Sequence, residues 1–284
     1  MSEKQESALR NISDTALWVA IYRARETERP DAWFRDPYAR LLAGERGEKI
    51  VNEVQNKMSQ EWPFIARTVN LDRIVADCVS DGVDLVINLA AGLDTRPYRL
   101  ELPADLKWIE VDLDDMIDYK EQSLAGETPR CSLERVRLDL RETEKRRELF
   151  SRLNGECTKA LVMSEGLLVY LDEAEVIALA KDLAAQKHFT DWAIDLGTPA
   201  LLKMMMKSYT ALEKADAPLK FAPTEGPEFF TQFGWKPVEI ESALHSAAKL
   251  KRLPWLFRLF ALLPDSKGKK PNQVWGGVVR FKQQ

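Results

Sequence analysis

Three acidic residues occupy equivalent positions in the sequence, each one or two residues beyond a short apolar run. They are Asp112 after 107–111, Asp139 after 133–137, and Glu165 after 160–163. A carboxylate can accept hydrogen bonds from ribose hydroxyls, from an adenine amino group or from an ammonium group. If the three runs are parallel strands of one open sheet, their carboxyl ends lie at the edge where ligands bind. The spacing therefore predicts one site that is lined by three carboxylates.

A fourth apolar run, 85–89, is followed by the small residues Ala90, Ala91 and Gly92. Small residues allow a ligand to approach the backbone closely. Each feature also has a purely structural alternative, since a tight turn needs no ligand and a strand-end carboxylate often caps the next helix or joins an ion pair. Asp114 could provide the cap after the second run, which would leave Asp112 free. Taken together, a small-residue turn and carboxylates at successive strand ends indicate an adenosine site.

The charge of this region distinguishes between adenosine cofactors. A dinucleotide site is expected to show the pattern G-x-G-x-x-G, with the diphosphate at a helix N-terminus. This turn has one glycine, Gly92, and Asp94 would place a negative charge beside the diphosphate. Like charges at that distance disfavour binding. S-adenosyl-L-methionine has no phosphate and carries a sulfonium and an ammonium group, so the acidic residues favour this cofactor.

The four runs belong to a longer alternation of strands and helices. Further strands are expected at 189–196, 234–240 and 274–281, and helices at 116–124, 141–153 and 172–185. Such alternation predicts an α/β fold with a parallel sheet that is covered on both faces. The last two strands are expected to be antiparallel neighbours at one edge. Helices are predicted in the first 80 residues, one of them ending at Gly44, and also over 199–220 and 243–263.

We expect residues 1–284 to form a single domain. Residues 1–80 would be a helical N-terminal extension, and 81–198 together with 233–284 the core of the sheet. Residues 199–232 and 242–270 would form lid or acceptor-binding segments.

Composition excludes several classes of protein. The net charge of −4, from 41 basic and 45 acidic residues, argues against a nucleic-acid partner. Cys78, Cys131 and Cys157 form no CxxC pair, and His188 and His245 are the two histidines, so no metal site is expected. The N-terminus lacks a secretory signal, and no apolar run approaches the roughly 20 residues of a bilayer span. These features predict a cytoplasmic protein without integral membrane contact.

Several motifs in order resemble the leucine carboxyl methyltransferase family, and specifically its bacterial O-methyltransferase branch, which is associated with polyketide biosynthesis. The resemblance covers roughly residues 10 to 200, and the matching segments are 15–16, 36–39, 88–100, 110–112, 139–141 and 164–171. It implies a class I, Rossmann-like methyltransferase fold with a seven-stranded, mostly parallel sheet whose last strand is antiparallel. Ala90 stands where the eukaryotic protein-modifying branch has glycine, which favours the bacterial branch.

The resemblance also implies roles for individual residues toward S-adenosyl-L-methionine. Arg67 would bind the methionine carboxylate, and Glu165 would lie near the ammonium group. The turn containing Ala90 and Gly92 would lie against the cofactor. Asp112 would hold the ribose, while Asp139 and Leu140 would bind the adenine. No residue is assigned as catalytic.

The acceptor is less well defined by the sequence. No general base is evident, since His188 and His245 are expected to be structural or exposed, and this favours a carboxylate over a phenol. Arg23 or Arg25 could clamp such an anion. The run 253–263 predicts a lid helix or a dimer contact rather than an in-plane membrane helix, because it contains a single arginine. The predicted function is O-methylation of a carboxylate or hydroxyl on a small molecule; the alternative is a non-catalytic adenosine-cofactor-binding or scaffold protein that retains the fold, and a homodimer remains open.

Overall fold

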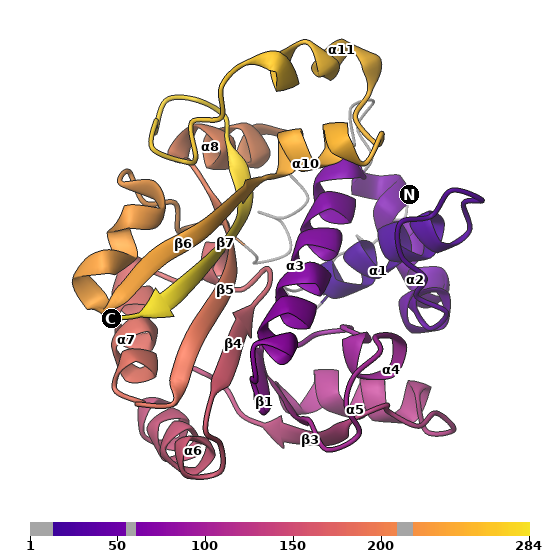
Figure 1. Ribbon diagram of the computed structural model, residues 1–284. Helices are drawn as coiled ribbons and strands as arrows, with labels where there is room; N and C mark the ends of the chain where they lie inside the picture. The colour runs from indigo at the N-terminus through magenta and orange to yellow at the C-terminus, as the bar shows by residue number, and fades with distance from the viewer. Residues whose placement is uncertain (1–13, 55–60, 209–217) are drawn as a thin grey trace, which may run out of the picture.

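The computed structural model describes residues 14–54, 61–208 and 218–284. A seven-stranded sheet crosses the centre of the molecule in the order β3-β2-β1-β4-β5-β7-β6 (Figure 1). The strands are β1 (Leu85–Leu89), β2 (Lys107–Asp112), β3 (Ser132–Arg137), β4 (Ala160–Ser164), β5 (Phe189–Gly197), β6 (Trp235–Ser242) and β7 (Gly276–Gln283).

The first five strands are parallel, and β7 is antiparallel to both β5 and β6. The predicted antiparallel neighbours are confirmed, with β6 at the edge and β7 one position inside it. Strands β1 and β4 are buried at every position, as expected for parallel strands covered on both faces. Their carboxyl ends lie together, so the residues that follow them meet at one edge of the sheet.

Helices cover both faces of the sheet. On one face, Leu71, Ile74 and Val75 of α3 (Trp62–Ser80) pack with Trp108 and Met163. On the other face, apolar side chains of α6 (Thr143–Gly155) and α7 (Glu173–Ala184) pack against alternate positions of the same strands. The capping box of Asp172 and Glu175 fixes the start of α7. The remaining helices of the core are α4 (Arg96–Arg99) and α5 (Asp114–Ser123).

The N-terminal region is helical, as predicted, and lies beside the carboxyl ends of the strands. It consists of α1 (Asp14–Thr27), α2 (Ala39–Val54) and α3. A helix does end at Gly44, as predicted, since that residue has a non-helical backbone conformation (φ 56°, ψ −171°), and a second helical segment follows the kink within α2. Glycine can adopt this backbone conformation without a Cβ clash.

The late helices are shorter than the sequence predicted. Helix α8 (Pro199–Ser208) ends before residue 220, residues 218–220 are not helical, and 209–217 lie outside the described residues. The stretch 243–263 is divided into α10 (Ala243–Lys249), α11 (Trp255–Arg258) and a 3-10 turn, η3 (Phe260–Leu262). Pro254 lies at the N-cap of α11, and residues 250–254 are not helical, which is consistent with the loss of a backbone donor at proline. Another 3-10 segment, η2 (Gly226–Phe233), precedes β6.

Across the three described stretches, every helix is too short or too polar to span a bilayer. The cysteines Cys78, Cys131 and Cys157 are buried free thiols. Burial raises the pKa of Cys78 to about 12 and those of Cys131 and Cys157 to about 11.

Candidate functional site

A cavity of about 660 Å³ lies beyond the carboxyl ends of the five parallel strands, β1 to β5. The structure places every predicted cofactor residue in its wall: Arg67, Ala90, Gly92, Asp112, Asp139, Leu140 and Glu165. These residues come from α3, from the last position of β2 and from the turns after β1, β3 and β4. The sheet topology therefore brings together side chains that are up to about a hundred positions apart in the sequence.

The turn after β1 has an unusual backbone conformation. Both Ala90 (φ 53°) and Gly92 (φ 48°) lie in the left-handed region, which is unfavourable for alanine. The Gly92 amide donates a hydrogen bond of 2.6 Å to Asp112 Oδ2, and so joins the ends of β1 and β2. Because the backbone turns back here without large side chains, it lies directly in the cavity wall.

Asp112 is a poor candidate for a helix cap. The N-cap of α5 is Leu113, which makes no side-chain capping bond, so neither Asp112 nor Asp114 caps this helix. Asp112 Oδ1 accepts from the Leu113 amide at 2.8 Å, and the carboxylate keeps unused lone pairs on both oxygens. Burial raises the pKa of Asp112, although bonds from the Gly92 and Leu113 amides oppose this shift.

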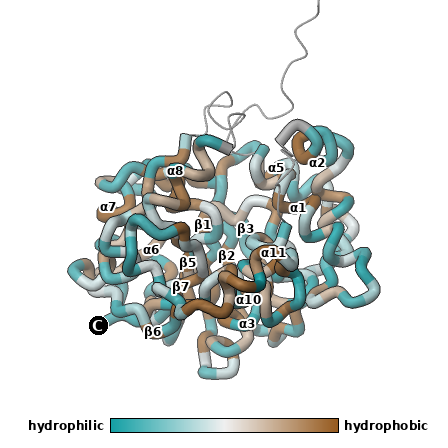
Figure 2. The backbone as a smooth tube through the Cα atoms, turned by 90° about the horizontal axis from the view of Figure 1, so that it is seen from above, coloured by the Kyte–Doolittle hydropathy of each residue, from teal (hydrophilic) through white to brown (hydrophobic). Residues whose placement is uncertain are grey.

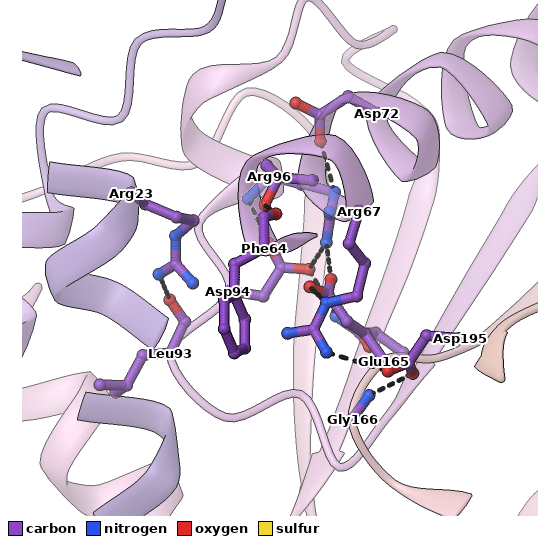
Figure 3. Close-up of polar contacts among 12 residues, drawn as sticks. Arg23, Phe64, Arg67, Asp72, Leu93, Asp94, Arg96, Glu165, Gly166 and Asp195 are labelled. Carbon is purple, nitrogen blue, oxygen red and sulfur yellow. Dashed lines mark hydrogen bonds and ion pairs between the residues drawn. The ribbon is translucent and has the colours of Figure 1, made fainter. Parts of the chain in front are cut away.

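Arg67 extends from α3 between two carboxylates (Figure 3). Its Nε lies 2.9 Å from Glu165 Oε1, and its Nη1 donates to Asp195 Oδ2 at 2.9 Å. Nη2 has no partner among the described residues, so a donor remains for a ligand carboxylate. Asp195 Oδ1 also accepts from the Gly166 amide at 2.6 Å, which fixes the turn after β4 against the end of β5.

Arg96 is the buried centre of a second set of ion pairs. Its Nη1 lies 2.7 Å from Asp94 Oδ2 and 2.8 Å from Glu165 Oε2, and its Nε lies 2.6 Å from Asp72 Oδ1 (Figure 3). Asp72 also pairs with Arg99. Glu165 therefore does form the structural ion pair that was its alternative role, while it also lines the cavity.

The ion pairs keep the buried carboxylates ionised. Burial alone would raise the pKa of Asp94, but attraction by Arg96 and Lys120 holds that pKa well below its usual range. Burial also opposes ionisation of Glu165, and attraction by Arg96 and Arg67 lowers its pKa nonetheless.

The connected network contains more negative than positive groups. Its members are the three guanidiniums of Arg67, Arg96 and Arg99 and the four carboxylates of Asp72, Asp94, Glu165 and Asp195. With Asp112 close by, the donor set suits a ligand that carries net positive charge and disfavours a diphosphate. The chemistry of the site thus fits S-adenosyl-L-methionine.

Asp139 and Leu140 lie in the cavity wall after β3. The N-cap of α6 is Glu142, so Asp139 does not cap that helix. Asp139 accepts from the backbone and side chain of Arg141, and these hydrogen bonds lower its pKa. Leu140 is partly buried against the core and offers an apolar surface beside the carboxylate.

One part of the cavity is lined by apolar side chains from α1, α3, α8 and the segment before η2. They are Trp18, Val19, Phe64, Leu201, Leu202, Met205, Leu219 and Phe221. Of the three consecutive methionines, Met205 faces the cavity, while Met204 and Met206 are exposed. Of these methionines, Met205 is therefore the one that contributes to the apolar wall.

The structure does not support an anion clamp by Arg23 or Arg25. Arg23 lines the cavity, but its Nε pairs with Asp36 at 2.8 Å and its Nη2 donates to the Leu93 carbonyl. Arg25 does not line the cavity and pairs with Glu48 and Glu61. In both cases an acidic residue that is distant in sequence already neutralises the guanidinium, which spacing alone could not reveal.

Neither histidine is among the residues of the cavity wall. His188 Nδ1 lies 2.8 Å from the Asn154 carbonyl, and His245 Nε2 lies 3.0 Å from the Leu263 carbonyl.

Sequence reasoning missed two residues of the site, Asp195 and Tyr170, which both line the cavity. Asp195 lies near the end of β5, so the rule that selected Asp112 and Glu165 could have selected it too. Tyr170 lies in the 3-10 turn η1 (Leu168–Tyr170), where burial raises its pKa and its side chain hydrogen-bonds Thr15.

Solved structures share this architecture. A protein from Thermobifida fusca, described as a "putative methyltransferase", superposes with a TM-score of 0.57 at 16% identity over 100% of both chains. A DUF574 family protein from Streptomyces avermitilis gives a TM-score of 0.55 at 14% identity, over 92% of this chain and 96% of that one. The fold is that of the class I S-adenosyl-L-methionine-dependent methyltransferases.

Sequence comparison identifies the family within that class. The leucine carboxyl methyltransferase family profile matches residues 16–184, which is more than half of the chain. The chain therefore belongs to the leucine carboxyl methyltransferase family, whose cofactor is S-adenosyl-L-methionine.

Relatives in two actinobacteria carry the name "Putative S-adenosyl-L-methionine-dependent methyltransferase". The relative from Mycolicibacterium paratuberculosis is 33% identical over 175 residues, which cover 57% of this chain and 58% of that protein. The relative from Streptomyces avermitilis is 31% identical over 197 residues, which cover 66% of this chain and 69% of that protein.

Proposed function

We propose that this chain is an S-adenosyl-L-methionine-dependent O-methyltransferase that methylates a carboxylate or a hydroxyl of a small, largely apolar molecule. The observation that carries this proposal is the composition of one cavity, where strand-end carboxylates adjoin an apolar wall. The name of the family, leucine carboxyl methyltransferase, supports a carboxylate as acceptor.

The cofactor would supply a methyl group on a positively charged sulfur that is already a good leaving group. Arg67 Nη2 is the donor for the methionine carboxylate, and Glu165 and Asp195 accept from the ammonium group. Asp112 accepts from the ribose hydroxyls, while Asp139 and Leu140 bind the adenine amino group and ring. Ala90 and Gly92 present backbone to the cofactor where a larger side chain would intrude.

The remaining task of the protein is to position the acceptor and to exclude water. Precise orientation of two reactants can contribute about 7–11 kcal/mol to lowering a reaction barrier. An acceptor carboxylate is ionised at neutral pH, so it needs no general base. A carboxylate acceptor is therefore compatible with the composition of the cavity wall. No histidine is found there among the described residues, and burial keeps the Tyr170 phenol protonated. Trp18, Phe64 and Leu219 then hold the apolar part of the acceptor.

We also propose that the chain forms a single domain, in which the segments 199–232 and 242–270 help to bind the methyl acceptor. Met205, Leu219 and Phe221 from the first segment line the cavity. From the second segment, Ala243 is in the wall.

Turnover with a methyl-labelled cofactor tests this function. The full chain is incubated with panels of apolar carboxylic acids and phenols, and labelled product is extracted and then treated with mild base. Carboxyl methylation predicts label that base releases as methanol, whereas a methyl ether would resist base. Retention of label on the cofactor across both panels, in a chain that binds the cofactor, would favour the scaffold alternative.

A further inference from the structure

The surface segment formed by α11 and η3 exposes an unusual number of large apolar side chains. Trp255 is 73% exposed and Leu262 is 79% exposed. The apolar patch, as we define it, consists of six residues that are each more than half exposed: Trp255, Leu256, Leu259, Phe260, Leu262 and Leu263. Figure 2 looks down on this part of the molecule, and the tube beside the labels α10 and α11 is largely brown.

The segment is anchored to the body of the protein from below. Phe257 and Ala261 pack on a small core formed by Ala66, Ala247 and Leu253. The His245 side chain contacts the Leu263 carbonyl at 3.0 Å and holds the end of the segment against α10. Phe257 and Ala261 point toward the protein, while the patch residues between and beside them are exposed to solvent. Trp33, which is half exposed, donates to the Leu250 carbonyl at 2.7 Å and lies beside the same support.

Basic residues flank the patch on both sides in the sequence. The stretch 249–270 contains seven basic residues and one acidic residue, although the whole chain has a net charge of −4. Arg252 and Lys269 are paired with acidic residues. The other five are exposed and form no ion pair with any described residue: Lys249, Lys251, Arg258, Lys267 and Lys270.

This combination of charge and exposure favours one kind of partner over another. Monomeric proteins rarely expose contiguous apolar patches of this kind unless the patch binds something. A second copy docked patch to patch would bring two sets of unpaired lysines together, and like charges would oppose that contact. A bilayer with anionic headgroups accommodates both features, because apolar side chains enter the interface while flanking lysines meet the headgroups. Tryptophan is also favoured at such interfaces.

We propose that residues 249–270 dock this protein onto the surface of a membrane that contains anionic phospholipids. The patch inserts into the headgroup boundary, and Lys249, Lys251, Lys267 and Lys270 lie against the lipid phosphates. The contact is peripheral, so it is compatible with helices that are too short or too polar to span a bilayer. The isolated run 253–263 contains a single arginine and gave no sign of this contact; the flanking lysines supply the basic character.

Co-sedimentation of the full chain with lipid vesicles tests the proposal. Vesicles of phosphatidylcholine alone are compared with vesicles of phosphatidylcholine mixed with phosphatidylglycerol, at low and at high salt. We expect binding to the anionic vesicles that weakens as salt is raised. Replacing Trp255 and Leu259 together by serine should lower the partition coefficient about tenfold or more. The charge reversals Lys267→Glu and Lys270→Glu should each lower it about fivefold or more.

Matched controls are available on other surfaces. Leu41→Ser removes an exposed leucine on α2, and Lys236→Glu reverses an exposed lysine on β6, so neither should change vesicle binding. All variants are first compared by circular dichroism and thermal unfolding. Equal binding to both vesicle types, no binding to either, or equal effects of patch and control variants would overturn the proposal. Sedimentation velocity that shows a dimer dissociated by the Trp255 and Leu259 changes would assign the patch to a second copy instead, and would also overturn it.

Discussion

The backbone amide of Gly92 donates a 2.6 Å hydrogen bond to the Asp112 carboxylate, and this bond links the carboxyl ends of β1 and β2 in the cavity wall. Twenty residues separate the two positions in the sequence. The bond orients the carboxylate toward the cavity and leaves lone pairs for a ligand. One side chain therefore shapes the turn and also offers the acceptor that a ribose would need.

Replacement of Asp112 by asparagine should weaken binding of S-adenosylhomocysteine by about 1–3 kcal/mol, because ribose hydroxyls lose a charged acceptor. Calorimetric titration measures the change. Asp114→Asn, two residues away on the exposed first turn of α5, is the matched control and should leave affinity unchanged. Equal affinities for wild type and Asp112→Asn would remove Asp112 from the ribose site.

Arg67→Ala should weaken binding of S-adenosylhomocysteine by about 1.5–3 kcal/mol, because a bond from a charged donor to the methionine carboxylate is lost. Methylthioadenosine lacks that carboxylate, so its affinity should change little. Comparing the two ligands separates loss of a specific contact from general damage to the site. Arg152→Ala, on the exposed side of α6, controls for loss of surface charge. A similar loss for both ligands would contradict the role given to Arg67.

On acidification, cofactor affinity should begin to fall at a higher pH than it would if Asp112 had the pKa of an ordinary aspartate. Burial raises the pKa of Asp112, so its protonated form, which is the poorer acceptor, accumulates at a higher pH than usual. The pKa values of Asp139 and Glu165 are lowered, and both remain ionised in this range. Titrations with S-adenosylhomocysteine at stepwise decreasing pH should show a decline that begins above the pH at which an ordinary aspartate is protonated. Asp112→Asn should abolish most of it, and an unchanged pH profile in that variant would assign the titration to another group.

Ala90→Gly should leave the fold intact and raise the free energy of unfolding by up to about 1 kcal/mol, since Ala90 adopts a left-handed conformation that glycine tolerates. Greater freedom of glycine in the unfolded chain offsets part of the gain. Urea denaturation gives the value. Ala91→Gly, at a neighbouring buried position with a negative φ, should instead destabilise the protein. Destabilisation of similar size by both substitutions would show that the Ala90 conformation is not strained.

Much of the fold follows from periodicity alone. β1 and β4 are short apolar runs that are buried at every position, and helices lie between successive strands; this alternation is typical of a parallel sheet covered on both faces. The prediction of one helix over 243–263 overlooked Pro254, where the missing backbone donor is a local signal for a break. The helical segment that follows Gly44 within α2 was also not predicted. The strand-end rule brought Asp112, Asp139 and Glu165 into one cavity. It was not applied to Asp195, and it could not show that Asp36 neutralises Arg23.

The central claim is that a cavity edged by carboxylates holds an adenosine ligand whose tail carries positive charge. Competitive titration of the full chain with S-adenosylhomocysteine and with NAD tests it most directly. We predict saturable binding of S-adenosylhomocysteine at one site per chain, undisturbed by an excess of NAD. Tight binding of NAD, with S-adenosylhomocysteine failing to displace it, would contradict the account.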